Sequence, residues 1–555
     1  MANQVLSKSY KPSQNFYASN LMLQDWLISN LSALSLAWMH EKLQFTGKSA
    51  ATMVDELSLD ADKNPPQLIK RDRFGNEINS IKFHPSYDKM QEIAIATGML
   101  NVKWDVDTRL KFNGELHAMG FSTGYLFAMA ELGLYCPLCM TDGVARLIDK
   151  FCSDEDRERL LPKIAANNIA DFNTGAMFLT EKSGGSDVGA NLVSATEADG
   201  GLYHLNGEKW FCSNANADLI MVLARTDASV KGTKGLSIFL VERYKPDGSV
   251  NYMNVVRLKD KLGVRSMASA EIILENTVGK MIGKPFEGFL IMAEMINLSR
   301  LYNSVAAVAG AARSLIEAYQ FLCHRKTFGK TAIEHPLVRR KMLELGSLQT
   351  ANFYLTWRTI KALDAADNGN KREEHLLRIL TPMTKRCTAE EGVYIVRESM
   401  ELMGGIGYIE ESVLPKIMRD MMVLPIWEGA GNIMILDMIR ASKRSDSLEI
   451  LIDEISTLIS EQTSIKVALE QFKDQLKKWQ AISDQELLEY NAKPIFEKLT
   501  LFTKYSILTY YAHEGNQAWM GPALTYLSDL ILINENGLGK CPSVEKIRGL
   551  MAWDY

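Results

Sequence analysis

The 555-residue sequence lacks several patterns that mark common classes of protein. Its 7 cysteines are too few and too scattered for a disulfide framework, which favours a reduced, cytoplasmic location. No run of about eighteen apolar residues is present, and the first arginine is Arg71. We therefore expect neither a membrane span nor an Arg-rich transit peptide. The net charge of -5 gives no general attraction to nucleic acid.

The usual catalytic and nucleotide-binding motifs are also missing. The 8 histidines are scattered, with no H-E-x-x-H, so neither a metal site nor a Ser-His-Asp triad can be argued from spacing. Gly405-Ile-Gly407 lacks the third glycine of G-x-G-x-x-G, and no G-x-x-x-x-G-K-[ST] occurs. Cys136 and Cys139 match C-x-x-C but lack a second pair, so we interpret them as buried, inert thiols.

The sequence does contain enough apolar residues to form several large hydrophobic cores. Hydrophobic residues make up 47% of the chain, and its length corresponds to roughly three to five domains. The periodicity changes along the chain, and it predicts an α+β protein that is mainly α. Four domains follow from these changes: helical residues 1–172 with a polar break at 60–66, a β domain at 173–284, a helical bundle at 285–441, and a last helical domain at 442–555.

Local patterns support this division. Short runs rich in Val, Ile and Leu at 219–223 and 236–241 predict strands, and Asp199-Gly200-Gly201 predicts a hairpin turn. After residue 300, apolar residues recur in steps of four and three, which predicts one stripe of a long amphipathic helix. The members of that stripe are Leu301, Val305, Val308, Ala312, Leu315, Tyr319 and Leu322. In the last domain Leu448, Leu451, Ile455 and Leu458 or Ile459 share a helical face.

Three polar, glycine-containing segments are candidates for ligand binding. Thr180 to Gly189 offers hydroxyls and a backbone whose amides could face an anion, although a surface turn explains it equally well. Lys209 to Asn214 places aromatic residues beside a hydroxyl, which suits a planar ring or a β core. Met403 to Tyr408 could simply end a helix.

In this order, these blocks resemble the acyl-CoA dehydrogenase family of flavoproteins, over residues 130 to 441. The motifs that carry the resemblance are Leu179-Thr-Glu-Lys-Ser-Gly-Gly-Ser-Asp187, Phe211 with Ser213, Arg325-Lys-Thr-Phe328-Gly, and Gly404-Gly405. Ile-Trp427-Glu-Gly and the helical region after residue 442 are most similar to the adaptive-response, AidB-type branch. The resemblance implies a helical, β-barrel or β-sandwich, and helical arrangement with an extra C-terminal helical domain.

The resemblance also implies non-covalent FAD and assigns residues to it. The assigned residues are Met177, Leu179, Thr180, Gly185, Ser186, Phe211, Ser213, Arg325, Thr327, Phe328, Glu401, Gly404, Gly405 and Asn432. In the family, the segment from Arg325 to Phe328 reaches the FAD of a neighbouring subunit, so a homotetramer is implied. Two departures concern the far ends of the ligands. Glu401 replaces a common glutamine on the adenosine side, and Met267 to Ala270 lacks an arginine found near the CoA.

Glu428 is the only charged residue between Leu424 and Leu436, and the resemblance makes it the catalytic base. Removing an α-proton from a thioester requires a carboxylate in a site drier than water. Apolar surroundings raise the pKa of a carboxyl and a helix N-terminus lowers it, so the sequence leaves the net effect open. The alternative is that Glu428 only caps the helix expected to begin at Gly431 or Asn432.

The implied function is FAD-dependent α,β-dehydrogenation of an acyl-CoA, a reaction of fatty acid metabolism, with an electron-transfer flavoprotein as the acceptor. Two alternatives from other classes are a nucleic-acid-associated flavoprotein with weak catalysis and an acyl-CoA-binding sensor. Between Lys443 and Tyr555 there are 12 Lys and Arg against 16 Asp and Glu, a net of -4. Because phosphate neutralisation dominates affinity for duplexes, we expect no strong binding to DNA.

Overall fold

The computed structural model describes residues 13–245, 247–459, 463–514, 517–532 and 542–554. They form two compact units. Unit 1 takes its described residues from 1–51, 113–129 and 303–555, and unit 2 consists of 52–112 and 130–302. None of the helices in these ranges is long and apolar enough to cross a membrane. The predicted division into four domains stays a prediction.

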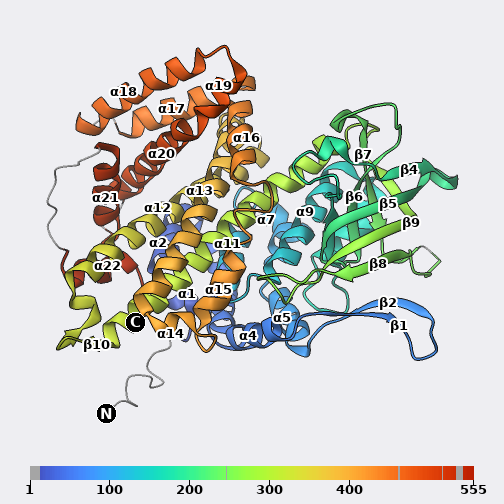
Figure 1. Cartoon of the computed structure of the whole chain (residues 1–555), viewed down its shortest axis with the longest axis horizontal. Coiled ribbons are helices and arrows are strands. Elements are labelled where there is room, and N and C mark those ends of the chain that lie inside the picture. Colours follow the sequence, from blue (N-terminus) through green and yellow to red (C-terminus); the bar gives the residue numbers. More distant parts are fainter. Residues whose placement is uncertain (1–12, 246, 460–462, 515–516, 533–541, 555) are drawn as a thin grey trace. The chain divides into compact units, whose positions relative to one another are not determined.

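Unit 1 is almost entirely helical (Figure 1). Its elements are α1 (Phe16–Ser19), α2 (Leu21–Asn30), α3 (Ala33–Ser49), the first two residues of the π-helical turn Ala50–Val54, α8 (Leu116–Ala128), the part of α11 (Gly288–His324) from residue 303, β10 (Lys326–Thr327), β11 (Lys330–Thr331), the 3₁₀ turn Ala332–Glu334, α12 (Pro336–Asp367), α13 (Lys371–Met403), α14 (Gly405–Tyr408), α15 (Val413–Met421), α16 (Gly431–Arg444), α17 (Ser447–Leu458), α18 (Thr463–Gln480), α19 (Gln485–Tyr490), α20 (Ala492–Glu514), α21 (Met520–Leu532) and α22 (Val544–Met551).

The long helices α12 and α13 pack together and carry the C-terminal helices of unit 1. α20 and α21 pack against α12, while α16 and α17 pack against α13 (Figure 1). Arg358 of α12 links three of these helices, because it pairs with Glu373 at 2.7 Å and with Glu454 of α17 at 3.0 Å. The face predicted for the last helical region is confirmed, and Ile459 is the buried member of its last pair.

Helix α11 is buried on more sides than an amphipathic helix with one apolar stripe would be. The predicted apolar positions are all buried, as expected. Polar residues between them are buried too, including Ser304, Arg313 and Glu317. Arg313 and Glu317 lie one turn apart and form an ion pair at 2.8 Å, which compensates their desolvation. Periodicity therefore located the helix correctly but wrongly implied a polar outer face.

Unit 2 combines short helices with a seven-stranded sheet. Its elements are α4 (Asp55–Lys63), β1 (Gln67–Arg71), β2 (Glu77–Lys82), α5 (Pro85–Ala96), α6 (Asn101–Trp104), α7 (Val106–Lys111), α9 (Tyr135–Phe151), α10 (Asp154–Ile164), β3 (Gly175–Phe178), β4 (Ser194–Glu197), β5 (Leu202–Ser213), β6 (Leu219–Arg225), β7 (Leu236–Glu242), β8 (Met253–Leu258), β9 (Ser269–Ile282), and the 3₁₀ turns Val188–Ala190, Asp199–Gly201 and Thr233–Gly235.

Five of the sheet strands close on themselves. β6 pairs with β7, β7 with β9, β9 with β5 and β5 with β4, and a bridge from Ser194 to Arg225 returns β4 to β6. β3 extends this ring by parallel pairing with β6, and β8 by antiparallel pairing with β9. Apolar side chains from both sides of the ring, such as Leu205, Val222 and Ile272, form one buried core. The expected barrel-like β domain is therefore present.

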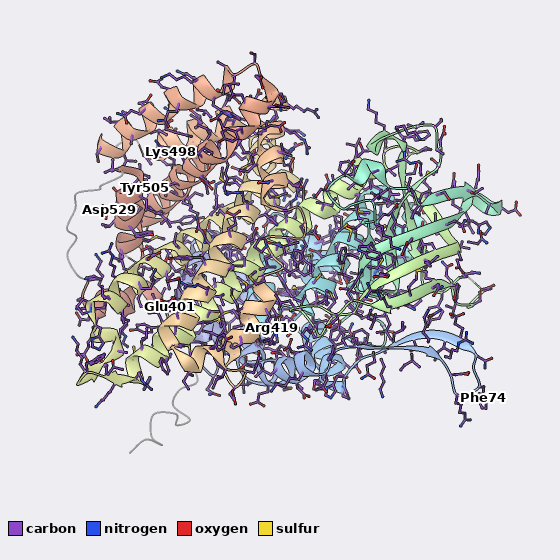
Figure 2. All side chains as sticks on the ribbon, in the orientation of Figure 1. Phe74, Glu401, Arg419, Lys498, Tyr505 and Asp529 are labelled. Carbon is purple, nitrogen blue, oxygen red and sulfur yellow. The ribbon has the colours of Figure 1, made fainter. Side chains whose placement is uncertain are left out.

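The sequence identified one hairpin of unit 2 and missed another. Asp199–Gly201 connects β4 to β5, and Gly200 and Gly201 have φ of 72° and 75°, which L side chains rarely adopt. The predicted break at 60–66 instead begins at Asn64, because α4 continues to Lys63. It leads into the hairpin β1–β2, whose turn carries Phe74 with 74% of its surface exposed (Figure 2).

Candidate functional site

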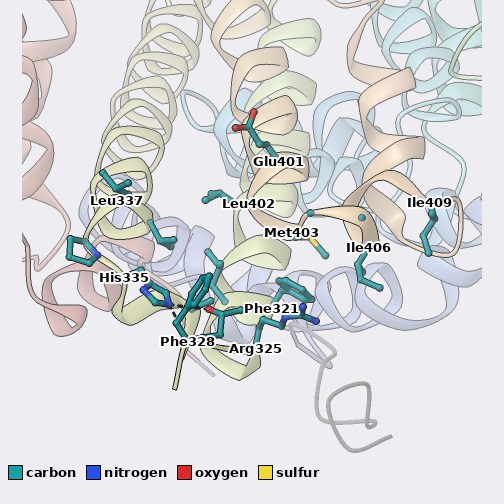
Figure 3. Close-up of a pocket in the computed structure, with 17 residues that line it drawn as sticks. Phe321, Arg325, Phe328, His335, Leu337, Glu401, Leu402, Met403, Ile406 and Ile409 are labelled. Carbon is teal, nitrogen blue, oxygen red and sulfur yellow. Dashed lines mark hydrogen bonds between the residues drawn. The ribbon is translucent and has the colours of Figure 1, made fainter. Parts of the chain in front are cut away.

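Unit 1 contains an open groove of about 910 Å³ where the end of α11 faces the end of α13 (Figure 3). Six of the predicted cofactor residues line it, from two segments more than seventy residues apart in sequence. They are Arg325, Thr327, Phe328, Glu401, Gly404 and Gly405. The fold thus brings together residues that the sequence motifs could only associate through the family resemblance.

One wall of the groove is the tight hairpin β10–β11, which follows directly after α11. Phe328 lies at its tip with φ of 50° and is 97% exposed. His335 holds Thr327 in place, because its Nε2 lies 3.0 Å from the hydroxyl oxygen and 3.2 Å from the carbonyl oxygen of Thr327. His335 also meets the Phe328 ring edge-on. Sequence reasoning missed His335, although its position just before Pro336, at the start of a helix, was a usable signal.

The opposite wall is the end of α13, where Met403 to Tyr408 does end a helix. Gly404 caps it with φ of 64°, a conformation that favours glycine. No heavy atom lies within 4 Å of a Cβ built on Gly404 or Gly405, so the backbone is open to an approaching ligand. Glu401 is exposed on the last turn and pairs with Arg397 at 2.7 Å. The same guanidinium also pairs with Glu398, so Glu401 shares its cation with a second carboxylate.

The predicted flavin loop lies in unit 2, between β3 and β4. Met177 belongs to β3, and Leu179 and Thr180 follow it as half-buried residues. The amide of Trp210 donates to the carbonyl of Thr180 at 2.9 Å, which joins the loop to β5. Gly185 packs against Thr180, since a Cβ there would lie 3.1 Å from the threonine hydroxyl. Ser186 is exposed at the end of this turn.

A buried ion pair between Lys209 and Glu181 holds the backbone of this loop. Nζ of Lys209 lies 2.8 Å from Glu181 and 3.3 Å from the carbonyl oxygen of Leu179. The second oxygen of Glu181 accepts the amide of Leu192, which ties the start of the loop to its end. Burial lowers the pKa of Lys209, and the carboxylate of Glu181 opposes that change. The pair fixes the backbone from which Thr180 and Ser186 project.

Phe211 and Ser213 lie on β5 on the side opposite Cys212. Cys212 is fully buried in the sheet core, whereas 56% of Phe211 is exposed. The Ser213 hydroxyl lies 3.1 Å from that of Ser269 on β9. An aromatic face and a hydroxyl are therefore presented together at one surface of unit 2.

Glu428 lies in unit 1, in the turn between α15 and α16. It is half-buried and has φ of 58°, which is unusual for a residue with a side chain, and Gly429 follows with φ of 99°. Holding such a conformation costs on the order of 1 kcal/mol or more. The N-cap of α16 is Ala430, so capping by Glu428 as the N-cap residue is wrong. Asn432 is exposed in the first turn of α16 and does not line the groove.

The structure shows where the two cysteines of the C-x-x-C pattern lie and whether potential metal ligands are grouped. Cys136 and Cys139 occupy α9, where Cys139 is buried and Cys136 is half-buried. Within the described ranges no three His, Cys, Asp or Glu side chains are grouped so that they could hold a metal ion.

Three family models match the chain in sequence order. The model of the adaptive response protein AidB N-terminal domain matches residues 5–169, that of the acyl-CoA dehydrogenase middle domain matches 176–277, and that of the acyl-CoA dehydrogenase C-terminal domain matches 287–443. The matched regions contain all the predicted site residues.

Individual relatives agree with these matches. AidB of Escherichia coli (strain K12) is 31% identical over 83% of this chain and 85% of its own length. Acyl-CoA dehydrogenase family member 11 of Caenorhabditis elegans is 27% identical over 72% of this chain and 66% of its own. The crystal structure of Caenorhabditis elegans ACDH-11 in complex with C11-CoA is similar with a TM-score of 0.86 and 25% identity, over 94% of this chain and 92% of that one. The chain therefore belongs to the acyl-CoA dehydrogenase family of FAD-dependent oxidoreductases acting on CH–CH groups, and it is AidB-like within that family.

Proposed function

We propose that this chain is an acyl-CoA dehydrogenase in which Glu428 removes the α-proton of an acyl-CoA thioester. When bound, FAD supplies the acceptor, at flavin N5, for the hydride that leaves the β-carbon. The carboxylate of Glu428 takes the α-proton, so two C–H bonds break and a C=C bond forms. The observation that carries the proposal is the convergence of segments 325–328 and 401–405 on one groove.

The chemistry of that groove fits an FAD. An exposed guanidinium at Arg325 suits an anionic diphosphate, and the open backbone at Gly404 and Gly405 allows close approach. The exposed ring of Phe328 offers a face for stacking. Separately, the hydroxyls of Thr180 and Ser213 and the ring of Phe211, all in unit 2, have the chemistry that suits a flavin ring. Asn432 keeps its proposed cofactor role only through the family resemblance.

The groove also supports assembly of several copies. A fully exposed phenylalanine is costly in water, and Leu337, which lines the same groove, is 80% exposed. We propose that a second copy and its FAD cover this surface within a homotetramer, and that an electron-transfer flavoprotein reoxidises the enzyme. The complex of ACDH-11 with C11-CoA supports an acyl-CoA as the substrate class.

The test is anaerobic bleaching of the flavin by butanoyl-, octanoyl- and hexadecanoyl-CoA. Glu428→Gln keeps the shape of the side chain but cannot accept the proton. It should retain FAD while the bleaching rate falls by about 100- to 10,000-fold. Glu390→Gln is the matched control, because that partly exposed carboxylate pairs with Arg386 instead. Equal rates for wild type and Glu428→Gln would show that the base lies elsewhere. Tight acyl-CoA binding by a wild type that is never bleached would support the sensor alternative.

A further inference from the structure

The turn that carries Glu428 is held at both ends by buried side chains from other helices. We define the base turn as residues 424–429. At its start, Nδ2 of Asn303 donates to the carbonyl oxygen of Leu424 at 3.1 Å. At its end, Nζ of Lys385 donates to the carbonyl oxygen of Gly429 at 2.6 Å. Asn303 comes from α11 and Lys385 from α13, so two helices fix one short segment.

The burial of Lys385 is informative because lysine is almost always exposed. Its side chain is only 1% exposed, in the middle of α13, and Asn303 is only 4% exposed. Taking an ammonium out of water is costly, and methionine would fill a similar space without that cost. Packing alone therefore does not account for a lysine here. The hydrogen bond to Gly429 is a specific role that a lysine can fill.

The backbone of the base turn needs such support. Its own hydrogen bonds, from the amides of Ile426 and Trp427 to the carbonyl of Val423, act on the first half of the turn. The second half contains Glu428 and Gly429, two consecutive residues with positive φ. A residue with a side chain keeps that conformation only where its surroundings impose it. Lys385 binds the carbonyl of the residue that immediately follows Glu428.

We propose that Lys385 and Asn303 are positioning residues that hold the base turn, so that the carboxylate of Glu428 is presented to the substrate in one orientation. This inference rests on the proposed role of Glu428. Neither side chain takes the proton, and each acts through a backbone carbonyl. Because proton transfer depends steeply on geometry, loosening the turn should slow the chemical step much more than it weakens acyl-CoA binding.

The experiment compares Lys385→Met and Asn303→Leu with wild type in anaerobic bleaching over a range of octanoyl-CoA concentrations. Both variants should bind FAD and give the oxidised flavin spectrum of the wild type. We expect the limiting rate of bleaching to fall by about 100-fold, as a misplacement of about 1 Å can cause. The octanoyl-CoA concentration for half-maximal rate should change by less than about threefold. Loss of binding and rate together would indicate a general structural defect and overturn the inference.

Lys504→Met is the matched control. Lys504 is also a buried lysine of unit 1, 3% exposed, but its ammonium pairs with Glu391 at 2.7 Å. This variant should lose thermal stability and keep the wild-type limiting rate. The inference is overturned if Lys504→Met slows bleaching as much as Lys385→Met does. It is equally overturned if both base-turn variants bleach within about twofold of wild type. Should Lys385→Met fail to fold, Asn303→Leu decides alone by the same rate criterion.

The failure of this inference can be told apart from failure of the proposed function. If Glu428→Gln is inactive while both positioning variants are fast, Glu428 is the base and the positioning role is wrong. If Glu428→Gln is as fast as wild type, or if no acyl-CoA bleaches the wild type, the proposed function is wrong. The positioning role then fails with it.

Discussion

Lys259 and Glu271 form an ion pair in unit 2, with 2.6 Å between Nζ and Oε1. The same ammonium lies 3.4 Å from the centre of the Trp210 ring, next to Phe211 on β5. Arg257 donates a second charged hydrogen bond to Glu271. One carboxylate thus anchors two cations beside the surface proposed to hold the flavin.

This cluster should make stability depend on pH. The hydrogen bond from Arg257, together with Lys259, holds the pKa of Glu271 below its ordinary value of 4.5, although burial acts in the opposite direction. A carboxyl whose pKa is lowered by folding contributes stability that is complete above the unfolded pKa and is lost as the pH falls through the folded pKa. The thermal midpoint of wild type should exceed that of Glu271→Gln at pH 6, and the difference should shrink below pH 4.5. Glu275→Gln, on the same strand but exposed, controls for loss of a carboxylate. A constant difference down to pH 3 would contradict this account.

The purified protein should be yellow and should release FAD when denatured. No cysteine or histidine is among the residues that we assign to the flavin, so no covalent link is expected. Absorbance of the supernatant after acid precipitation, followed by chromatography of the released flavin, measures this. A colourless protein that does not take up added FAD would refute the cofactor assignment.

Arg325→Ala should weaken FAD binding by about 10- to 100-fold, because a hydrogen bond to a charged group contributes about 1.5–3 kcal/mol. Lys330→Ala is the control, since Lys330 lies in the same hairpin but does not line the groove. FAD affinity can be measured by fluorescence titration of the apoprotein.

Wild type should be a tetramer in solution, and light scattering measures its mass. A monomer that still binds FAD tightly would count against a site shared between copies.

The C-terminal helices should not bind duplex DNA strongly. Lys473 is already paired with Glu470 at 2.8 Å, and the acidic Asp474 is exposed on the same helix as Lys477 and Lys478. A fluorescence-anisotropy titration at about 0.15 M salt should show no binding in the range of about 1–100 μM that is typical of non-specific binders. Micromolar binding that is weakened by charge reversal at Lys477 and Lys478 would overturn the prediction and favour the nucleic-acid alternative.

Patterns that repeat locally predicted the fold well. The apolar face of α17 and the turn at Asp199–Gly201 follow from side-chain spacing and from glycine, both of which act within a few residues. The hairpin β1–β2 was missed because its strands are largely exposed and lack a clear alternation of apolar residues. Nothing local marks such a segment as strand, and its contact with β8, through Lys70 and Asn254 at 2.8 Å, involves residues far along the chain.

The candidate site, too, could be predicted from the sequence only in part. Family motifs named Arg325 and Gly404, and the fold places both on one groove. The positive φ of Glu428 could not be read from Trp-Glu-Gly, because glutamate rarely adopts it. Lys385 was missed for a related reason. Lysine is usually a surface residue, so the sequence does not indicate that Lys385 is buried. The partner of Lys385, Gly429, lies 44 positions away.

The closed ring of strands in unit 2 determines how this unit can meet another chain. In the main sheet β3 is paired only with β6 and β8 only with β9, among the described strands, and both are short. α9 packs against β3, where the hydroxyl of Thr141 accepts a hydrogen bond from the amide of Gly175, and the β1–β2 hairpin contacts β8. A foreign strand would have to displace one of these covers before it could add to the sheet. The contacts at β3 and β8 thus oppose edge-to-edge pairing through the main sheet, whereas the β1–β2 hairpin keeps the outer edges of a two-stranded sheet.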